Sequence, residues 1–221
     1  MIADCVTSVG ACNVPMDDWG IDVIASGSQK GYMMPPGLSF VAMSQKAWKA
    51  NIRSNLPKFY LDLASYKKAA DNNSNPFTPG VNLYFALEES LKIMKEEGLN
   101  SIFQRHTRHM KATQEAMNAI GLKLFAKEGF GSPAITSVMA NNDLNIEEIR
   151  KHMKSKFDIL IAGGQDHLKG KIFRVGHLGF INDRDIITAV AAIEASLEHM
   201  DGLIHPLGTG VSAAIRVLNA K

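Results

Sequence analysis

Three short apolar runs, each followed by a turn-rich loop, most strongly constrain how the first part of this chain can fold. They lie at residues 1–6 (MIADCV), 19–26 (WGIDVIAS) and 38–44 (LSFVAMS). Such runs predict strands of one α/β sheet, with the loops after the strands available for ligands. The first run reads as the last half of a buried strand that ends at Asp4. A buried strand needs neighbours on both sides, so we expect the chain to be a piece of a longer protein.

Two helices in series follow and predict a domain boundary. Residues 45–55 are polar and predict a short helix, and residues 71–80 (DNNSNPFTPG) are rich in Asn, Ser, Pro and Gly, which predicts a loop. Apolar side chains then recur near helical spacing over residues 81–97, and Gly98 stops the pattern. A second helix is expected over residues 99–119. We therefore place a domain boundary near Gly98.

The last part of the chain alternates short strands with helices. Asn145 is followed by Glu148 as in a capping box, and Asn182 is expected to be the N-cap of the last long helix. The expected elements are strands at 122–126 and 135–140, a helix at 146–157, strands at 158–164 and 171–179, and a helix at 183–200. The pattern predicts a compact α+β domain over residues 98–221, after a first domain over residues 1–97.

Composition and charge exclude several classes of protein. The chain has 221 residues, of which 46% are hydrophobic and 21% charged, and its formal net charge is +2. This balance argues against nucleic acid or an anionic membrane as a partner. No apolar run approaches the ~20 residues that span a bilayer. The two cysteines, Cys5 and Cys12, form no disulfide framework and lack the spacing of a metal or redox site, so we expect reduced thiols and no metal. Because the start also lacks a secretory signal, we expect a cytoplasmic protein.

Two chemically informative side chains follow the first two predicted strands. Asp4 ends the first strand and Lys30 follows the second, so one edge of the sheet could carry both groups. A partly desolvated lysine becomes an amine nucleophile, and a carboxylate can hold a protonated ring nitrogen. Pyridoxal phosphate requires this pair of groups. Spacing alone leaves a plainer reading open, in which backbone N–H groups satisfy Asp4 and Lys30 is a surface lysine.

A longer series of motifs resembles one enzyme family. Residues 4–40 contain, in order, Asp-x-Val-x-Ser, Gly-Ile-Asp, Ser-Gly-Ser-Gln-Lys and Pro-Pro-Gly. Together with NPFTPG (residues 75–80), ESLKIMKEEGL (residues 89–99) and KIFRVGHLG (residues 171–179), these motifs resemble the class V pyridoxal-phosphate-dependent aminotransferases. Within that family the resemblance is to the alanine–glyoxylate, serine–pyruvate and serine–glyoxylate group, and it covers nearly the whole chain. It implies pyridoxal-phosphate fold type I, with part of the large domain, which holds a mixed sheet, preceding a small α+β domain.

The resemblance implies roles for four residues around the cofactor. Lys30 would form the Schiff base with the aldehyde of pyridoxal phosphate, and Asp4 would bind its pyridine nitrogen. Gln29 would donate to its phosphate. Val6 would pack against a face of its ring, although simple core burial explains this valine equally well.

Two further positions match the family pattern, and one departs from it. Thr78 matches the position that reaches the cofactor phosphate of the neighbouring subunit in a homodimer; the alternative is a residue of a Thr-Pro turn before a helix. Arg174 would clamp the α-carboxylate of the substrate in a planar fork; the alternative is an edge or salt-bridge arginine. Asn75 stands where family members commonly have a tyrosine or another side chain that assists at the partner's phosphate, so that contact is weakened or replaced here.

Two parts of the family pattern are missing from this sequence. They are the Gly-rich phosphate loop at a helix N-terminus and the aromatic residue that stacks on the cofactor ring. Phosphate binding depends on such a helix end. We therefore expect the chain alone to bind pyridoxal phosphate weakly or not at all, to expose a sheet edge and apolar faces, and to work with the missing N-terminal part of the same protein.

The resemblance implies transamination between a small amino acid, alanine or serine, and a 2-oxo acid, glyoxylate or pyruvate. One alternative is a cysteine desulfurase or lyase. Desulfurases use a cysteine on a mobile loop and a histidine directly before the lysine, whereas Gln29 precedes Lys30 here and both cysteines follow Asp4 closely. The other alternative is a catalytically inactive fragment with a structural or interaction role.

The remaining candidates point to structure rather than chemistry. His177 is expected to be structural, and residues 207–213 (LGTGVSA) are expected to form a turn before a short helix rather than a nucleotide loop. No ligand set for an iron–sulfur cluster or nickel is visible. A basic cluster on the second predicted helix is expected to be a solvated face rather than a nucleic-acid patch; its members are Arg105, His106, Arg108 and His109.

Overall fold

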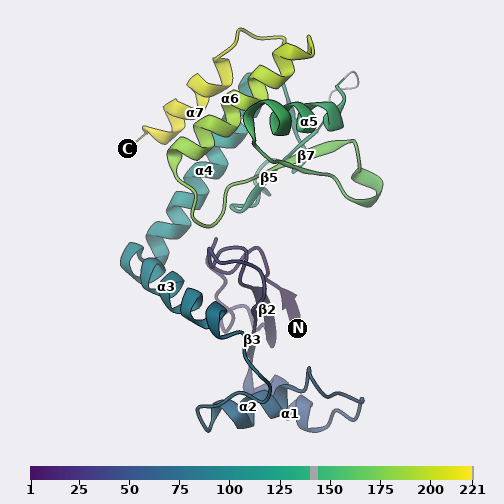
Figure 1. The fold of residues 1–221 in the computed structure, drawn as a ribbon, viewed down its shortest axis with the longest axis vertical. Helices are drawn as coiled ribbons and strands as arrows, with labels where there is room; N and C mark the ends of the chain where they lie inside the picture. The colour runs from purple at the N-terminus through teal and green to yellow at the C-terminus, as the bar shows by residue number, and fades with distance from the viewer. Residues whose placement is uncertain (140–143, 221) are drawn as a thin grey trace. The chain divides into compact units, whose positions relative to one another are not determined.

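The computed structural model describes residues 1–139 and 144–220, and these form two compact units. The first unit contains Met1–Val9 and Asn13–Glu97, and the second contains Gly10–Cys12 and the described residues from Gly98 onward. Figure 1 shows the elements of both units.

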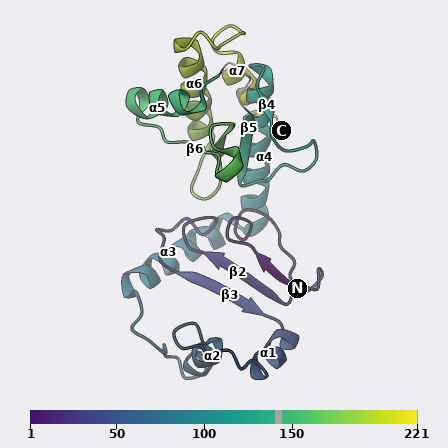
Figure 2. The ribbon, with the colours of Figure 1, turned by 90° about the vertical axis from the view of Figure 1, so that its right-hand side faces the viewer.

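The first unit is built on a mixed three-stranded sheet. Its strands are β1 (Ile2–Asp4), β2 (Val23–Gly27) and β3 (Ser39–Met43), in the order β1-β2-β3 (Figure 2). β1 runs parallel to β2, and β3 runs antiparallel to it. All three apolar runs at the start of the chain therefore form strands of one sheet, as predicted.

The prediction that β1 is a buried strand is wrong for this chain. The side chain of Ile2 is 79% exposed, and Asp4 is exposed as well. The physical reason is that β1 has only one neighbour, β2, among the described strands. A strand paired on one side leaves its other edge, and here one of its faces, open to solvent.

The helices of the first unit follow local capping signals. α1 (Gln45–Ile52) begins after Ser44, whose hydroxyl accepts the N–H of Ala47. α2 (Leu63–Ala70), which was not predicted, begins after Asp62, and this aspartate is an N-cap signal that the sequence does contain. α3 (Val81–Glu97) ends at Gly98, which has a φ of +81° that a glycine adopts without strain.

The second unit is an antiparallel sheet with helices. The sheet has the order β4-β5-β7-β6. In chain order its elements are α4 (Leu99–Ala119), β4 (Lys123–Leu124), β5 (Ile135–Met139), α5 (Ile146–Phe157), β6 (Ala162–Gly163), the 3-10 helix η1 (Asp166–Leu168), β7 (Ile172–Gly176), α6 (Asp183–His199) and α7 (Thr209–Leu218). Each predicted strand and helix of this region is present, although Ala140, the last residue of one predicted strand, lies outside the described residues. In the described part of the chain, no helix is long and apolar enough to cross a membrane.

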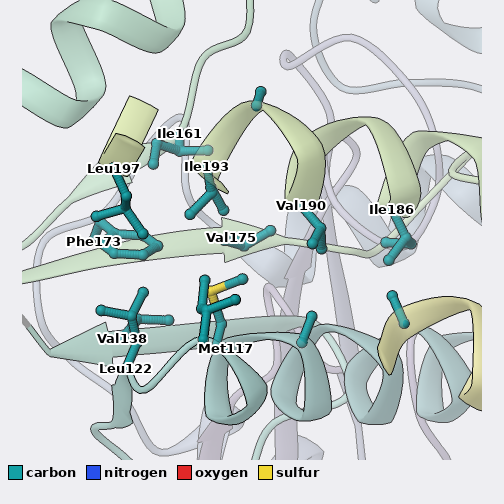
Figure 3. Packing of buried hydrophobic residues seen from close by; sticks show 14 of the residues in the cluster. Met117, Leu122, Val138, Ile161, Phe173, Val175, Ile186, Val190, Ile193 and Leu197 are labelled. Carbon is teal, nitrogen blue, oxygen red and sulfur yellow. The ribbon is translucent and has the colours of Figure 1, made fainter. Parts of the chain in front are cut away.

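The large hydrophobic core belongs to the second unit. Figure 3 shows side chains of α6, among them Ile186, Val190 and Ile193, that point toward β7. Phe173 and Val175 of β7 belong to the same buried cluster. Because side chains alternate along a strand, these two residues face the core and the residue between them, number 174, lies on the opposite face of the sheet.

A buried carboxylate caps α7. Glu194 of α6 is fully buried, and its two oxygens accept the N–H groups of Gly210 (2.9 Å) and Val211 (3.2 Å) in the first turn of α7. A helix N-terminus with free N–H groups attracts anions, and Glu194 is the anion that occupies this one. Residues 207–213 are therefore a turn before a short helix, as predicted, and not a nucleotide loop.

Candidate active site

The carboxylate of Asp4 lies at the carboxyl end of β1, next to β2. Asp4 pairs with Ala25 in the sheet register, two residues before β2 ends at Gly27. Its Oδ1 accepts the N–H of Val6 at 3.0 Å. In the part of the chain that the structure describes, Oδ2 has no hydrogen-bond partner. The backbone therefore satisfies one oxygen, as the plainer reading expects, and the other remains available to a ligand.

Cys5 follows Asp4 directly, and its thiol has a raised pKa. Burial raises the pKa of the Cys5 thiol, and the neighbouring carboxylate of Asp4 raises it further. Neither cysteine forms a disulfide bond; Cys5 is buried and Cys12 is half-buried. A thiol with a raised pKa is a poor nucleophile at neutral pH, so this site offers an amine rather than a thiolate.

Val6 and Gln29 meet over Gly27, where β2 ends. A Cβ atom added to Gly27 would lie 2.9 Å from Oε1 of Gln29 and 3.7 Å from Cγ1 of Val6. The absence of a side chain at Gly27 thus lets Gln29 fold back over the backbone. Val6 is half-buried, so simple core burial does not account for it fully. The structure brings Asp4, Val6 and Gln29 together at one edge of the sheet.

Lys30 follows directly in the loop after β2. It is half-buried, and its carbonyl oxygen accepts the N–H of Met33 at 3.0 Å. Its Nζ makes no hydrogen bond or ion pair with the residues that the structure describes. Lys30 is therefore neither a fully solvated lysine nor part of a salt bridge, and its amine is available for chemistry.

Thr78 lies in the loop before α3, at some distance along the chain from the β2 edge. It is exposed, and its hydroxyl makes no hydrogen bond to the described residues, so it does not cap α3. Asn75, where the sequence departs from the family pattern, accepts a hydrogen bond from the hydroxyl of Tyr84 at 3.2 Å. Tyr84 thus holds this loop against α3.

Arg174 belongs to the second unit and is held by the backbone. Its Nε donates to the carbonyl of Gly163 at 2.8 Å. Among the described residues its two terminal nitrogens have no partner, so they can receive both oxygens of a carboxylate. β7 lies between β5 and β6. Arg174 is therefore neither an edge residue nor part of a salt bridge within the described chain.

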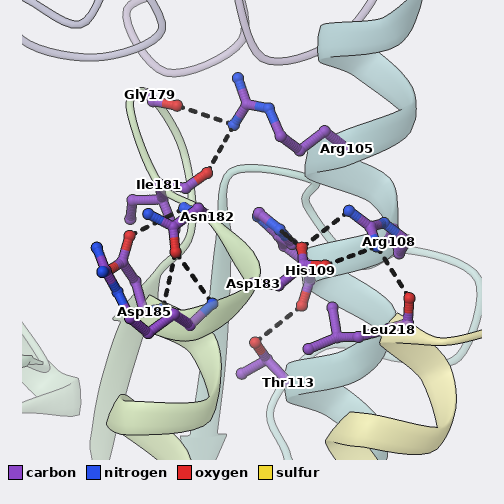
Figure 4. A network of polar contacts seen from close by, with 11 residues as sticks. Arg105, Arg108, His109, Thr113, Gly179, Ile181, Asn182, Asp183, Asp185 and Leu218 are labelled. Carbon is purple, nitrogen blue, oxygen red and sulfur yellow. Dashed lines mark hydrogen bonds and ion pairs between the residues drawn. The ribbon is translucent and has the colours of Figure 1, made fainter.

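The basic cluster of α4 corrects our expectation of a solvated face. His106 and His109 are fully buried. Arg108 makes two hydrogen bonds to the carboxylate of Asp183, at 2.8 and 2.9 Å, and Nε2 of His109 contacts the same carboxylate at 2.8 Å (Figure 4). These side chains bind α4 to the first turn of α6.

The same stretch of α4 also holds the loop after β7. Nη1 of Arg105 donates to the carbonyls of Gly179 and Ile181, as Figure 4 shows. Nε2 of His106 accepts the N–H of Gly179 at 3.0 Å. Since Nε2 accepts, His106 is neutral. The basic residues of α4 thus position the segment that connects the strand of Arg174 to α6.

Burial and the Asp183 carboxylate act in opposite directions on His109. Burial lowers the pKa of His109, and the hydrogen bond to Asp183 opposes that shift without cancelling it. Burial also works against ionisation of Asp183, yet its hydrogen bonds with His109 and Arg108 lower its pKa overall. Asp183 therefore stays charged, and Arg108 is the cation that balances it.

The first unit presents a distinct arrangement of functional groups, and the second presents one arginine. A carboxylate and an unpaired amine follow adjacent parallel strands, with a glycine between them that leaves room above the backbone. A carboxylate and an amine are the groups that a ligand with a basic ring nitrogen and an aldehyde requires. This donor set is typical of the class of enzymes that use pyridoxal phosphate.

Comparison with known proteins identifies the family. The family model described as "Aminotransferase class-V" matches residues 1–168, and the chain belongs to this family. Membership implies pyridoxal phosphate as the cofactor. The fold is that of pyridoxal-phosphate-dependent aminotransferases, because solved members superpose closely on the chain.

Two solved structures show the likeness of fold. The ureidoglycine–glyoxylate aminotransferase of Bacillus subtilis is 28% identical, with a TM-score of 0.92 over 99% of this chain and 57% of that one. The alanine–glyoxylate aminotransferase of Nostoc sp. is 30% identical, with a TM-score of 0.84 over 89% of this chain and 53% of that one.

Curated relatives carry two kinds of name. A protein of Synechococcus sp. (strain PCC 6716) named "Soluble hydrogenase, small subunit" is 57% identical over 99% of this chain and 57% of its own length. The serine–glyoxylate aminotransferase of Methylorubrum extorquens is 34% identical over 97% of this chain and 54% of its own length. The chain thus spans little more than half the length of the curated relatives it matches.

In the described part of the chain, no three His, Cys, Asp or Glu side chains lie together as a metal site would require. The candidate residues of the first unit were predicted from strand ends and from the family motifs. The anchoring of Arg174 by Gly163 had no sequence signal, because the partner is a backbone carbonyl.

Proposed function

We propose that this chain provides the reactive lysine and the carboxylate-binding arginine of an aminotransferase. The enzyme would transfer the amino group of alanine or serine to glyoxylate or pyruvate. The proposal depends on one observation: Asp4 ends β1 and Lys30 follows the adjacent parallel strand β2, and the Lys30 amine makes no hydrogen bond or ion pair with the described residues. Relatives named as serine–glyoxylate and alanine–glyoxylate aminotransferases support the choice of substrates.

Each residue would perform one elementary task. When bound, pyridoxal phosphate supplies an electron sink for the negative charge that develops on the substrate's α-carbon. Asp4 would hold a proton on the ring nitrogen through its free oxygen. Lys30 would take the α-proton on Nζ and return it, and Gln29 would bind the phosphate. Arg174 would fix the substrate carboxylate in a planar fork and so orient the α C–H bond.

The proposal is tested with a full-length protein, meaning one of the relatives' length that contains this chain. This protein is incubated with glyoxylate and either alanine or serine, and the formation of the 2-oxo acid from the amino acid is measured. Lys30→Arg keeps the charge but removes the chemistry, so we expect at least a 1,000-fold loss of rate, on the order expected for a missing general base and nucleophile. Lys49→Arg, on an exposed helix position, is the matched control. Full activity in Lys30→Arg would refute the role of this lysine.

Arg174→Lys provides a second measurement of the same site. A lysine keeps the positive charge but cannot form two parallel hydrogen bonds. We expect KM for the amino acid to rise about tenfold, equivalent to ~1.4 kcal/mol, with a smaller change in kcat. An unchanged KM for the amino donor would remove Arg174 from the substrate site.

We also propose that a second copy of the protein packs against the loop that carries Thr78. Phe59, Tyr60 and Phe77 form ring contacts there, with centroids 4.9 and 5.3 Å apart, and Phe59 remains 79% exposed. Phe85 of α3 is 67% exposed. Large aromatic side chains each bury roughly 150–250 Å², so four or five such residues reach about the 800 Å² that a stable interface needs per partner.

The family resemblance favours a second copy as the occupant, because Thr78 would then reach the neighbour's cofactor phosphate. Sedimentation of the chain and of Phe59→Ser tests this. We expect the wild type to self-associate and Phe59→Ser to shift toward monomer by at least tenfold in Kd. Equal behaviour of the two proteins would overturn the proposal.

The isolated chain should bind pyridoxal phosphate weakly or not at all, because the family's phosphate loop and stacking aromatic residue are not in it. Titration by absorbance checks this, and a stable stoichiometric band would contradict it. Sulfide release from cysteine, assayed in parallel, decides between transamination and desulfuration.

The names of two relatives favour a structural role as an alternative to the enzyme role. Proteins 57% and 55% identical are named as soluble hydrogenase subunits. The alternative is therefore a chain that acts as a structural subunit of a larger assembly. If the protein of the relatives' length transfers amino groups, the enzyme role is supported. If it transfers none and co-purifies stably with a hydrogenase, the structural role is supported.

A further inference from the structure

The loop that carries Lys30 is closed by a buried serine. Ser28 is fully buried; its N–H donates to the carbonyl of Leu38 at 3.1 Å, and its own carbonyl accepts the N–H of Met34 at 3.2 Å. Its hydroxyl donates to the carbonyl of Pro35 (2.7 Å) and accepts the N–H of Leu38 (3.2 Å). The two ends of the loop are therefore joined by four hydrogen bonds to one residue.

Tyr32 ties the middle of this loop to three different elements. Its carbonyl accepts a hydrogen bond from the hydroxyl of Ser90 in α3. Its ring packs on Phe40 of β3 with centroids 4.5 Å apart, and Ser26 of β2 lies close enough to its hydroxyl to affect the pKa of that hydroxyl. Burial raises the pKa of Tyr32, so the hydroxyl stays protonated at neutral pH.

The backbone directly after Tyr32 is under strain. Met33 has a φ of +60°, in the left-handed region that a long side chain rarely occupies. The N–H of Met33 closes the turn on the carbonyl of Lys30. A strained residue persists only where its surroundings hold it, and here the contacts of Tyr32 precede Met33 while the hydrogen bond from Met34 to Ser28 follows it.

We propose that Tyr32 is a positioning residue for Lys30: its contacts to α3, β2 and β3 fix the turn and so fix the place of the lysine amine. The proposal rests on the proposed function of Lys30. Without the Tyr32 ring the turn loses its contact with Phe40, and on this side only the hydrogen bond from Ser90 to the backbone carbonyl still holds it. Met33 is then free to return to ordinary backbone angles. The amine then samples many positions, and the rate advantage of a held reactive group is lost.

Hydrogen exchange of the apoprotein chain tests the clamp itself. Tyr32→Phe removes the hydroxyl but keeps the ring contact, so we expect protection of residues 29–38 to change by less than about twofold. Tyr32→Leu also removes the ring contact, and we expect a fall of at least tenfold. Protection of Val23–Gly27 should not change. Trp19→Leu, which replaces an exposed aromatic residue of the same unit, is the control and should leave residues 29–38 unaffected.

Amine reactivity then separates positioning from simple stability. A short pulse of acetylating reagent modifies Lys30 and the exposed Lys49 in the same molecule, and their ratio is read by peptide mass spectrometry. We expect the ratio to change at least threefold in Tyr32→Leu, because release of the turn alters only the surroundings of Lys30. A residue that merely stabilised the unit would leave this ratio constant among folded molecules.

Wild-type exchange and a wild-type labelling ratio in Tyr32→Leu would overturn the proposal. Should Tyr32→Leu not fold, Ser90→Ala removes the contact to α3 and takes its place in both measurements. Neither measurement uses cofactor. A separate experiment uses the protein of the relatives' length, to which pyridoxal phosphate and then borohydride are added. If no adduct forms at Lys30 but the exchange and labelling results are as expected, the proposed function is wrong and the positioning of Lys30 by Tyr32 is still supported.

Discussion

Burial determines the charge of His177. Its Nδ1–H donates to the carbonyl of Pro133 at 2.9 Å, and its Nε2 accepts the hydroxyl of Thr136 at the same distance. Both contacts suit the neutral ring. Burial lowers the pKa of His177 to about 4, and the nearby His109 and His106 contribute to the shift. The histidine is thus structural, as the sequence reading expected.

The lowered pKa of His177 predicts acid sensitivity of the second unit. In the unfolded chain the ring binds its proton near pH 6.5, but in the folded chain it does so only near pH 4. The unfolded state therefore holds more protons between these values, and the free energy of unfolding should fall by about 3 kcal/mol as the pH drops from 6.5 to 4. Urea unfolding at several pH values measures this. His177→Asn should flatten the dependence, whereas the exposed His167→Asn should not.

Single residues show what the sequence could and could not predict about the site. Asp4 and Lys30 could be predicted from the sequence because both follow predicted strands. Burial of the histidines could also have been predicted, because Ile102, His106 and His109 recur at helical spacing on the apolar side of α4. We instead assigned the histidines to a solvated face because they lie next to arginines. The partner Asp183 had no sequence signal, because only the fold brings it to α4.

At the scale of elements, capping residues were the most reliable guide. Asn145 and Asn182 accept N–H groups of the helices that follow them, as predicted, and α6 has a complete capping box. The predicted strand at 158–164 is reduced to Ala162–Gly163. The reason is local, since Asp158 ends α5 in the left-handed conformation and the N–H of Ile159 returns to the carbonyl of Met153.

The carboxylate that caps α7 yields a prediction at this scale. Glu194→Ala would leave the N–H groups of Gly210 and Val211 buried and unpaired, since the N-cap Gly208 has no side chain to replace it. We expect a loss of roughly 2–4 kcal/mol in the free energy of unfolding, and a smaller loss for Glu194→Gln, which keeps one acceptor. The exposed Glu198→Ala, one turn further along α6, is the control. Equal stability of the two alanine variants would show that the cap contributes nothing.

At the scale of the whole molecule, the two units differ in how much core they hold. The buried cluster of the first unit consists of Cys5, Ile21 and Ile24 in the described residues, whereas that of the second joins four helices and the sheet. Stability follows buried apolar area. We therefore expect amides of β2 and β3 to exchange at least 100-fold faster than those of α4 and α6. Equal protection of both units, measured on the intact chain, would contradict this.

The two outer strands of the first unit's sheet have a consequence for handling the protein. β1 and β3 each pair only with β2 among the described strands, and Ile2 and Val41 lie exposed beside them. An unpaired edge strand of this kind is a template to which another extended peptide can add as a further strand. In concentrated solution, the same hydrogen-bonding groups would favour thioflavin-positive fibrils that grow from the first unit, and a short peptide able to lie along β1 would block that growth.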